Sequence, residues 1–205
     1  MGDVTVIGHG EASGSPDVFM ATVGVSVRSR RIAGVMADVK AKARAVIDAV
    51  LDSGVATEDV RTAWMSVHPQ FDGNRITGYA ADNSVRITVR DLSKVSDVLD
   101  KAVTAGGEAA QLSGVSFDLQ DSTDLATQAR ERAFADAKAR AEQYAALSGG
   151  TLGKVLRIDE TGGHAGPSPR AEFAMLRAAG GPPVEAGQQT VSAQITVVWE
   201  LTQSV

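Results

Sequence analysis

The stretch that decides the fold is Thr123–Ser148, TDLATQARERAFADAKARAEQYAALS, which is dominated by alanine. One side of the expected helix carries a leucine and then five alanines at every fourth position: Leu125, Ala129, Ala133, Ala137, Ala141 and Ala145. Recurrence at this spacing predicts a helix with one smooth face. A face without large side chains lets a helix lie close to a sheet or to another helix. Gly149-Gly150 follows and ends the helix.

Strands are expected on the C-terminal side of this helix. Lys154–Asp159 is a short strand, and the last strand alternates with the clearest pattern in the chain. Its apolar face is predicted to carry Val191, Ala193, Ile195, Val197, Trp199 and Leu201. Trp199 is therefore expected in the core. Between the two strands, residues 161–187 are rich in Gly and Pro, which predicts a mobile insertion within the final hairpin.

In the chain before the alanine helix, segments whose apolar residues recur every 2 residues alternate with segments whose apolar residues recur about every 3.6 residues. The expected strands are Asp3–Ile7, Val18–Arg28, Val60–Phe71, Thr77–Arg90 and Gly114–Leu119, and the expected helices run from Ile32 to about Leu51 and from Asp91 or Ser93 to about Gly106. The first two strands are close enough to pair as a hairpin. The order is ββαββαβαββ, which predicts an α+β fold with a mixed or largely antiparallel sheet and three helices packed on it. Residues 1–205 are expected to form a single domain.

Composition excludes several classes of protein. The chain has 205 residues, 43% of them apolar, with a net charge of −5. These values are typical of a folded globular protein, and the acidic balance argues against a nucleic-acid partner. The absence of cysteine removes thiol catalysis, zinc–thiolate sites and disulfides. No segment reaches the roughly 18 apolar residues of a membrane span.

Two glycine-rich stretches resemble nucleotide-binding loops, but neither lies between a strand and a following helix, as such a loop must. Gly8–Gly14 precedes a strand instead of a helix, so no helix N-terminus would hold a pyrophosphate. Gly149–Val155 leaves a helix and enters a strand, the reverse of a phosphate loop. His9, His68 and His164 are too far apart in sequence to form a local metal site. We therefore expect no cofactor, no metal and no catalytic residue.

Two places are candidates for contact with a partner. Arg28, Arg30 and Arg31 form the densest basic cluster, which suits a phosphate or carboxylate. Phe173, Met175 and Leu176 form an apolar group within the Gly/Pro-rich stretch, which suits docking on another subunit or protein, because long loops often carry function. The alternatives are an enzyme with a polar site near Gly8–Asp17, or an adaptor that binds an anionic partner through the three arginines.

The sequence resembles the SIMPL-domain family, a bacterial family of unknown biochemical activity that includes periplasmic immunogenic proteins. The resemblance rests on Val4–Gly10 with Pro16-Asp17, Ser66–Phe71, Gly78–Val85, Gly114–Phe117, the alanine helix leading to Gly153-Lys154-Val155, and Val184–Gly187. It implies an α+β fold, homo-oligomers, and links to envelope function or oxidative stress, and it supplies no catalytic residues.

The resulting functional expectation is a non-enzymatic, self-associating scaffold or binding protein. Homo-oligomerisation and a protein partner are expected. Because the residues after Met1 contain no basic region followed by an apolar stretch, the sequence as written predicts a cytoplasmic protein. A periplasmic or exported protein is expected if Met1 does not begin the natural chain.

Overall fold

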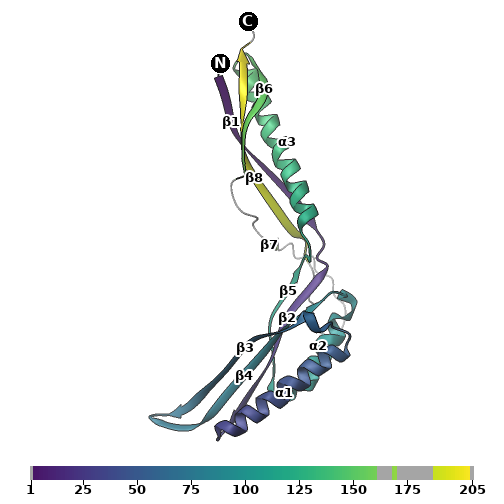
Figure 1. Ribbon diagram of the computed structural model, residues 1–205, viewed down its shortest axis with the longest axis vertical. Helices are drawn as coiled ribbons and strands as arrows, with labels where there is room; N and C mark the ends of the chain where they lie inside the picture. The colour runs from purple at the N-terminus through teal and green to yellow at the C-terminus, as the bar shows by residue number, and fades with distance from the viewer. Residues whose placement is uncertain (1, 161–167, 170–186, 204–205) are drawn as a thin grey trace. The chain divides into compact units, whose positions relative to one another are not determined.

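The computed structural model describes residues 2–160, 168–169 and 187–203 (Figure 1). The elements are β1 (Gly2–Gly14), β2 (Val18–Ser29), α1 (Ile32–Asp52), β3 (Val60–Asp72), β4 (Arg75–Val89), α2 (Val95–Gly106), β5 (Ala110–Asp118), α3 (Thr123–Leu147), β6 (Gly150–Glu160), β7 (Ser168–Pro169) and β8 (Gln189–Gln203). The predicted α+β class is confirmed, and the predicted order is found with the short β7 added. Nearly all of the stretch 161–187 lies outside the described residues.

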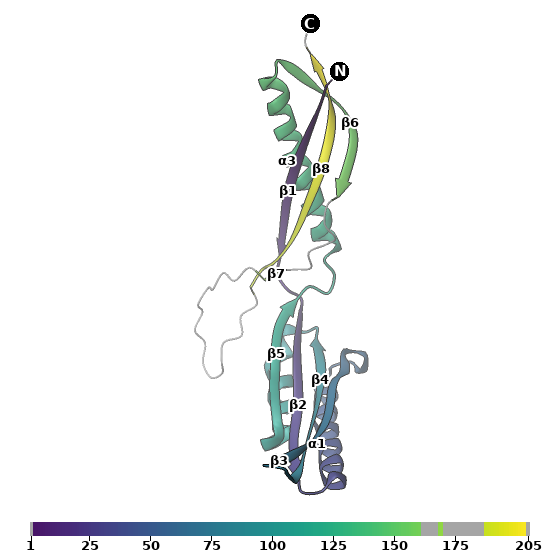
Figure 2. The same ribbon diagram turned by 90° about the vertical axis from the view of Figure 1, so that its left-hand side faces the viewer.

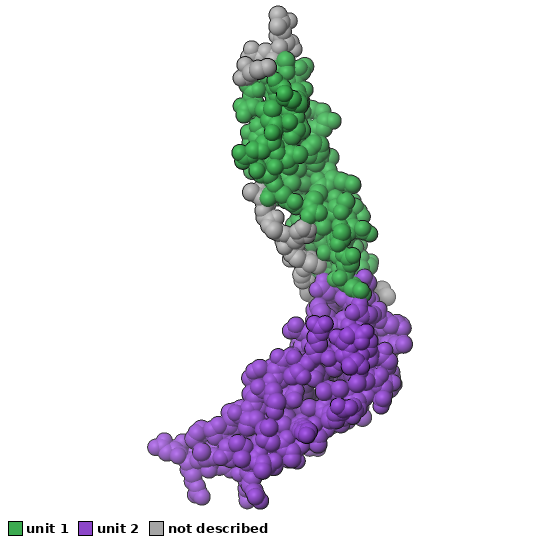
Figure 3. Space-filling view, in the orientation of Figure 1, with its two compact units in different colours: residues 1–16, 119–205 green, residues 17–118 purple. Residues whose placement is uncertain are grey.

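The chain folds into two compact units (Figure 3). Unit 1 comprises residues 1–16 and 119–205, and unit 2 comprises Asp17–Asp118. The prediction of one sheet is wrong, because each unit has its own antiparallel sheet. Alternation along a strand shows which residues share a face, but it does not reveal which strands share a sheet. The assignment of residues 1–205 to a single domain stays a prediction.

The sheet of unit 1 has the order β1-β8-β6, with β7 also paired to β8. β6 and β8 are antiparallel neighbours, so the predicted final hairpin is confirmed. The predicted hairpin of the first two strands is wrong. β1 pairs with β8 over its whole length, from Gly2 opposite Leu201 to Gly14 opposite Gln189. β2 has no edge left for β1, because β4 and β5 occupy both of its sides.

The first strand also continues through the glycines that were expected to end it. A Cβ atom on Gly8 would lie 2.1 Å from the carbonyl oxygen of Ala133, and one on Gly10 would lie 2.0 Å from that of Ala129. Real Cβ atoms do not approach backbone atoms so closely. These two glycines are therefore sites where a helix backbone approaches a strand. The predicted alanine face of α3 is confirmed, and it is buried against β1 and β8.

The core of unit 1 is small, and Trp199 is its largest buried side chain. Trp199 is 2% exposed, so its predicted place in the core is confirmed. It packs with Val6, Ile195, Val197 and the alanines of α3. Its ring centroid lies 6.1 Å from that of Phe134 on α3. One large aromatic residue thus fills space that the short alanine side chains leave open.

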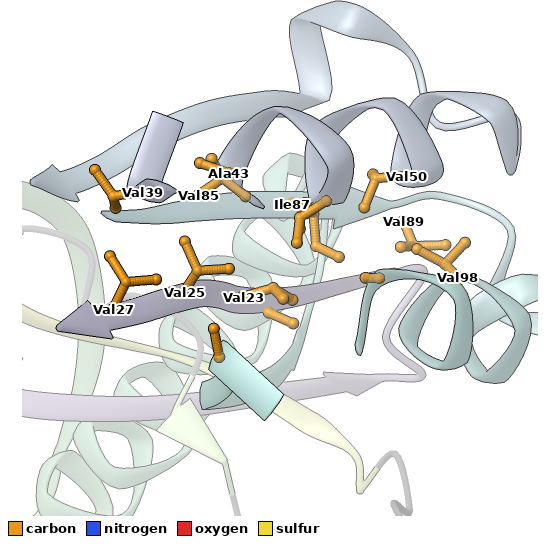
Figure 4. Packing of buried hydrophobic residues seen from close by; sticks show 14 of the residues in the cluster. Val23, Val25, Val27, Val39, Ala43, Val50, Val85, Ile87, Val89 and Val98 are labelled. Atoms are coloured by element: carbon orange, nitrogen blue, oxygen red, sulfur yellow. The ribbon is translucent and has the colours of Figure 1, made fainter. Parts of the chain in front are cut away.

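The sheet of unit 2 has the order β3-β4-β2-β5, and α1 and α2 pack on one of its faces (Figures 1 and 2). The core between them is mostly valine. Figure 4 shows side chains of β2, β4, α1 and α2 meeting in it; the labelled residues are Val23, Val25, Val27, Val39, Ala43, Val50, Val85, Ile87, Val89 and Val98. β-Branched side chains suit these strands because they pack well on a pleated surface. The two helices contact β2, β4 and β5, and they leave much of β3 exposed.

Gly8→Ala is expected to destabilise the protein, because the added methyl group would push α3 away from β1. The expected loss is about 1–3 kcal/mol of unfolding free energy. Gly2→Ala is the matched control on the same strand, since its Cβ would meet the side chain of Leu201 at an ordinary 3.9 Å. Chemical denaturation of both variants measures the difference. Equal stability of the two variants would contradict the close approach of helix and strand.

Trp199→Ala is expected to cost about 3–5 kcal/mol, because it removes the largest side chain of the unit 1 core. The control is Trp64→Ala in β3, where the side chain is 60% exposed and the change should stay within about 0.5 kcal/mol. Denaturant melts followed by circular dichroism measure both. A loss below about 1 kcal/mol for Trp199→Ala would place the core elsewhere.

Candidate functional site

The sheet of unit 2 has an open face, on the side away from α1 and α2 (Figure 2). Strand register places alternate residues of neighbouring strands together on this face. Ser66 of β3, Asp82 of β4 and Ser26 of β2 lie in one row across the sheet. His68, Ala80 and Arg28 form the next row. These two rows are therefore largely polar, and the exposed Trp64 of β3 lies on the same face.

Three polar side chains lie close together on this face. The Ser66 hydroxyl donates to Oδ2 of Asp82 at 3.2 Å. Nδ1 of His68 lies 4.0 Å from the same carboxylate oxygen. Asp82 is half-buried between its neighbours, whereas the His68 side chain is 52% exposed. Asp82 thus bonds Ser66, whereas His68 lies near it at a distance longer than a hydrogen bond.

This arrangement differs from that of a nucleophilic serine. In such a site the imidazole accepts the proton of the serine hydroxyl, and the carboxylate orients the imidazole. Here the hydroxyl of Ser66 is directed to Asp82 instead of His68. The group therefore presents polar side-chain atoms at the surface of the sheet, on the same face as the exposed Trp64 indole.

Sequence reasoning missed Ser66 and Asp82 as a pair, because cross-strand neighbours depend on register. The spacing of Ser66 and His68 was the available signal, since residues two apart on a strand share a face. Arg28 also lies on the open face, whereas Arg30 and Arg31 are exposed in the connection between β2 and α1. Phe173, Met175 and Leu176 lie outside the described residues.

The segment from Gly8 to Asp17 is the predicted alternative enzyme site. Side chains of α3 form hydrogen bonds with its backbone at His9 and Glu11. The His9 N–H donates to Oδ2 of Asp136 at 2.9 Å, and this hydrogen bond holds the pKa of the Asp136 carboxyl below its ordinary value, with Arg140 adding to the effect. Arg140 donates to the carbonyl of Ile7 at 3.2 Å, and Arg132 donates to that of Glu11. Charged side chains of α3 thus bond the outer edge of β1. The enzyme alternative stays a prediction.

An ion pair between a half-exposed arginine and a buried carboxylate lines a cavity of about 150 Å³ in unit 2. Arg90, directly after β4, donates to both carboxylate oxygens of Asp59, at 2.7 and 2.8 Å. The hydrogen bonds from Arg90 hold the pKa of Asp59 below its ordinary value, against the opposing effect of burial. The Asp59 side chain is 8% exposed. The pair ties the turn that follows α1 to β4, which makes it a structural contact.

Among residues 2–160, 168–169 and 187–203, no three His, Asp or Glu side chains are grouped so that they could hold a metal ion. In the same residues, no helix is long and apolar enough to cross a membrane.

Comparison with known proteins shows the family to which the chain belongs. The model of a family described as "SIMPL: Protein of unknown function (DUF541)" matches residues 4–199. The "26 kDa periplasmic immunogenic protein" of Brucella melitensis is 28% identical to this chain, over 97% of the chain and 84% of that protein. The Brucella abortus protein of the same name matches equally, and the "Uncharacterized protein YggE" of Edwardsiella ictaluri is 25% identical over 76% of this chain and 66% of that protein.

Likeness to solved structures is slight. A crystal structure of AtUAH in complex with glyoxylate covers 54% of this chain and 28% of that chain at 15% identity, with a TM-score of 0.29. Nothing about activity follows from it.

Asp59→Asn is expected to flatten the acid side of the stability profile. Because the folded pKa of Asp59 is lowered, the stabilisation from its ionised form is present above the ordinary value of about 3.9 and is lost as the pH falls through the folded pKa. The wild type should therefore lose more stability below about pH 4 than this variant does. Asp48→Asn, in the exposed pair with Arg44, is the control and should follow the wild type. Denaturation at a series of pH values tests the difference.

Proposed function

The chain belongs to the SIMPL family of proteins of unknown function, and on that premise we propose that it is a non-enzymatic, self-associating binding protein of the bacterial envelope. The observation that carries the proposal is the difference between the two edges of the unit 1 sheet. One edge is closed by the chain itself, and the other presents apolar side chains to solvent.

The closed edge is β1. Its outer carbonyl and N–H groups bond Arg132, Asp136 and Arg140 of α3, so another chain cannot pair there without displacing these contacts. Natural sheets commonly protect an edge in this way, by charged residues or by a covering helix.

The open edge is β6. Its outer side pairs with no strand among the described residues. Val155, Leu156 and Ile158 are exposed on this strand. Exposed apolar residues on an unpaired strand are the usual template for pairing with another chain. Pairing of β6 with a second copy would bury both the backbone groups and these side chains.

We place the protein in the periplasm within this proposal, as the alternative to the cytoplasmic location predicted above. Support comes from the Brucella relatives, whose printed name describes a periplasmic protein and which match 97% of this chain. The link to envelope or oxidative-stress function remains an implication of the family resemblance.

The native mass of the purified chain tests self-association. Light scattering at micromolar concentration is expected to give a multiple of the 21.2 kDa subunit mass. A double variant, Leu156→Lys with Ile158→Lys, is expected to lower the mass while it leaves the melting temperature nearly unchanged, since both side chains are exposed.

The matched control is Leu147→Lys at the end of α3, an exposed apolar residue that is not part of β6, which should keep the native mass of the wild type. A monomeric wild type would contradict self-association. A mass that is unchanged by the β6 variant and lowered by Val115→Lys would move the interface to β5, a free edge of the unit 2 sheet.

A further inference from the structure

Positive charge gathers at one end of unit 2, although the whole chain is acidic. Residues 28–44 contain six basic residues and one acidic residue, Asp38, whereas the net charge of the chain is −5. This stretch covers the end of β2 and the first half of α1. The hairpin between β3 and β4 adds Arg75 beside Asp72 at its turn. We call this region, residues 28–44 and 71–76, the basic end.

Most cations of the basic end have no ion-pair partner among the described residues; Arg44, which pairs with Asp48, is the exception. Lys101, Lys138 and Arg140 each pair with an acidic residue one turn away on their own helix. Within the described residues, no ion pair involves the side chains of the following: Arg28, Arg30, Arg31, Lys40, Lys42 and Arg75. Their charges are therefore available to an anionic partner.

Large apolar side chains are exposed at the same end. Phe71 and Ile76 face each other across the hairpin turn and are 61% and 49% exposed. Ile32 and Met36 are exposed in the first two turns of α1. Figures 1 and 2 both place the hairpin turn and the start of α1 at one end of the unit. Apolar and basic side chains thus lie on the same part of the surface.

The helices α1 and α2 do not cover the whole sheet of unit 2, which leaves part of β3 exposed. Neither helix packs over β3, so the inner face of β3 beyond α1 has no cover. A groove of about 580 Å³ separates α1 from the strands, with Met36 and Met65 on its two sides and Lys40 and Arg44 among its lining residues. The groove thus lies between apolar residues of α1 and Met65 of β3, and Lys40 and Arg44 flank it.

We propose that the basic end docks on an anionic lipid surface. Phe71 and Ile76 would enter the boundary between headgroups and acyl chains, while Arg28, Arg30 and Arg31 would contact the headgroups. Binding of this kind combines buried apolar area with attraction to anionic lipid. A lipid surface fits better than a folded partner, because the apolar residues lie at a protruding hairpin turn with no facing wall, and the cations are spread over two elements.

Sedimentation with vesicles tests the proposal on the full chain. We expect binding to vesicles of phosphatidylglycerol and phosphatidylcholine in equal parts, weaker binding as salt increases, and little binding to phosphatidylcholine alone. Each basic residue near the surface contributes about 1 kcal/mol, or about fivefold in partitioning. Arg30→Gln and Arg31→Gln should each show that loss, and Phe71→Ser should weaken binding as well.

Matched controls lie in unit 1. Lys154→Gln removes an exposed cation, and Leu147→Ser removes an apolar side chain that is 75% exposed. Both should bind anionic vesicles as the wild type does. The native mass of every variant is measured, so that a change in self-association is distinguished from a change in lipid contact.

A fluorescent reporter locates the contact. In a double variant, Trp64→Phe with Phe71→Trp, the new indole sits at the hairpin turn, and Trp199 stays buried. Its emission should shift to the blue with anionic vesicles.

Three results would overturn the proposal: equal binding to both kinds of vesicle, equal loss in the unit 1 controls, or no shift of this emission. Binding of an acidic amphipathic peptide without binding of vesicles would also overturn it, in favour of a protein partner.

Discussion

The contact between two glycines of β1 and the backbone of α3 is the constraint on which unit 1 depends. Gly8 and Gly10 leave no side chain between strand and helix, and the alanines of α3 leave almost none from the other side. Helix and sheet therefore approach until backbone meets backbone. A core this thin has room for few large residues, which explains why Trp199 and Phe134 dominate it.

The same close approach decides which edges of the sheet remain available. Because α3 lies against β1, its charged side chains reach the outer backbone groups of that strand. β6, on the other side of β8, has less contact with α3 and stays exposed. Protection of one edge and exposure of the other are thus two consequences of one helix position. In unit 2, two helices on a four-stranded sheet leave β3 uncovered in a comparable way.

The interpretation of the glycines shows how a local pattern can mislead. Gly8-His9-Gly10 has the composition of a strand ending, and the sequence predicted one there. The strand continues because the missing side chains are required by a helix more than 100 residues later. Ser66 and Asp82 illustrate the same limit at the candidate site. Ser66 lies opposite Asp82 only because of the register between β3 and β4, and the sequence of either strand alone does not determine that register.

The sequence by itself determined the class of the fold, the order of its elements, the alanine face of α3 and the burial of Trp199. These properties follow from periodicity, which each segment carries within itself. Three features depend on the tertiary structure: the presence of two sheets, the pairing of β1 with β8, and the exposure of apolar residues on β3 and β6. Those features depend on which segments pack together. The contacts that stabilise this packing join residues far apart in the chain, so no single segment encodes them.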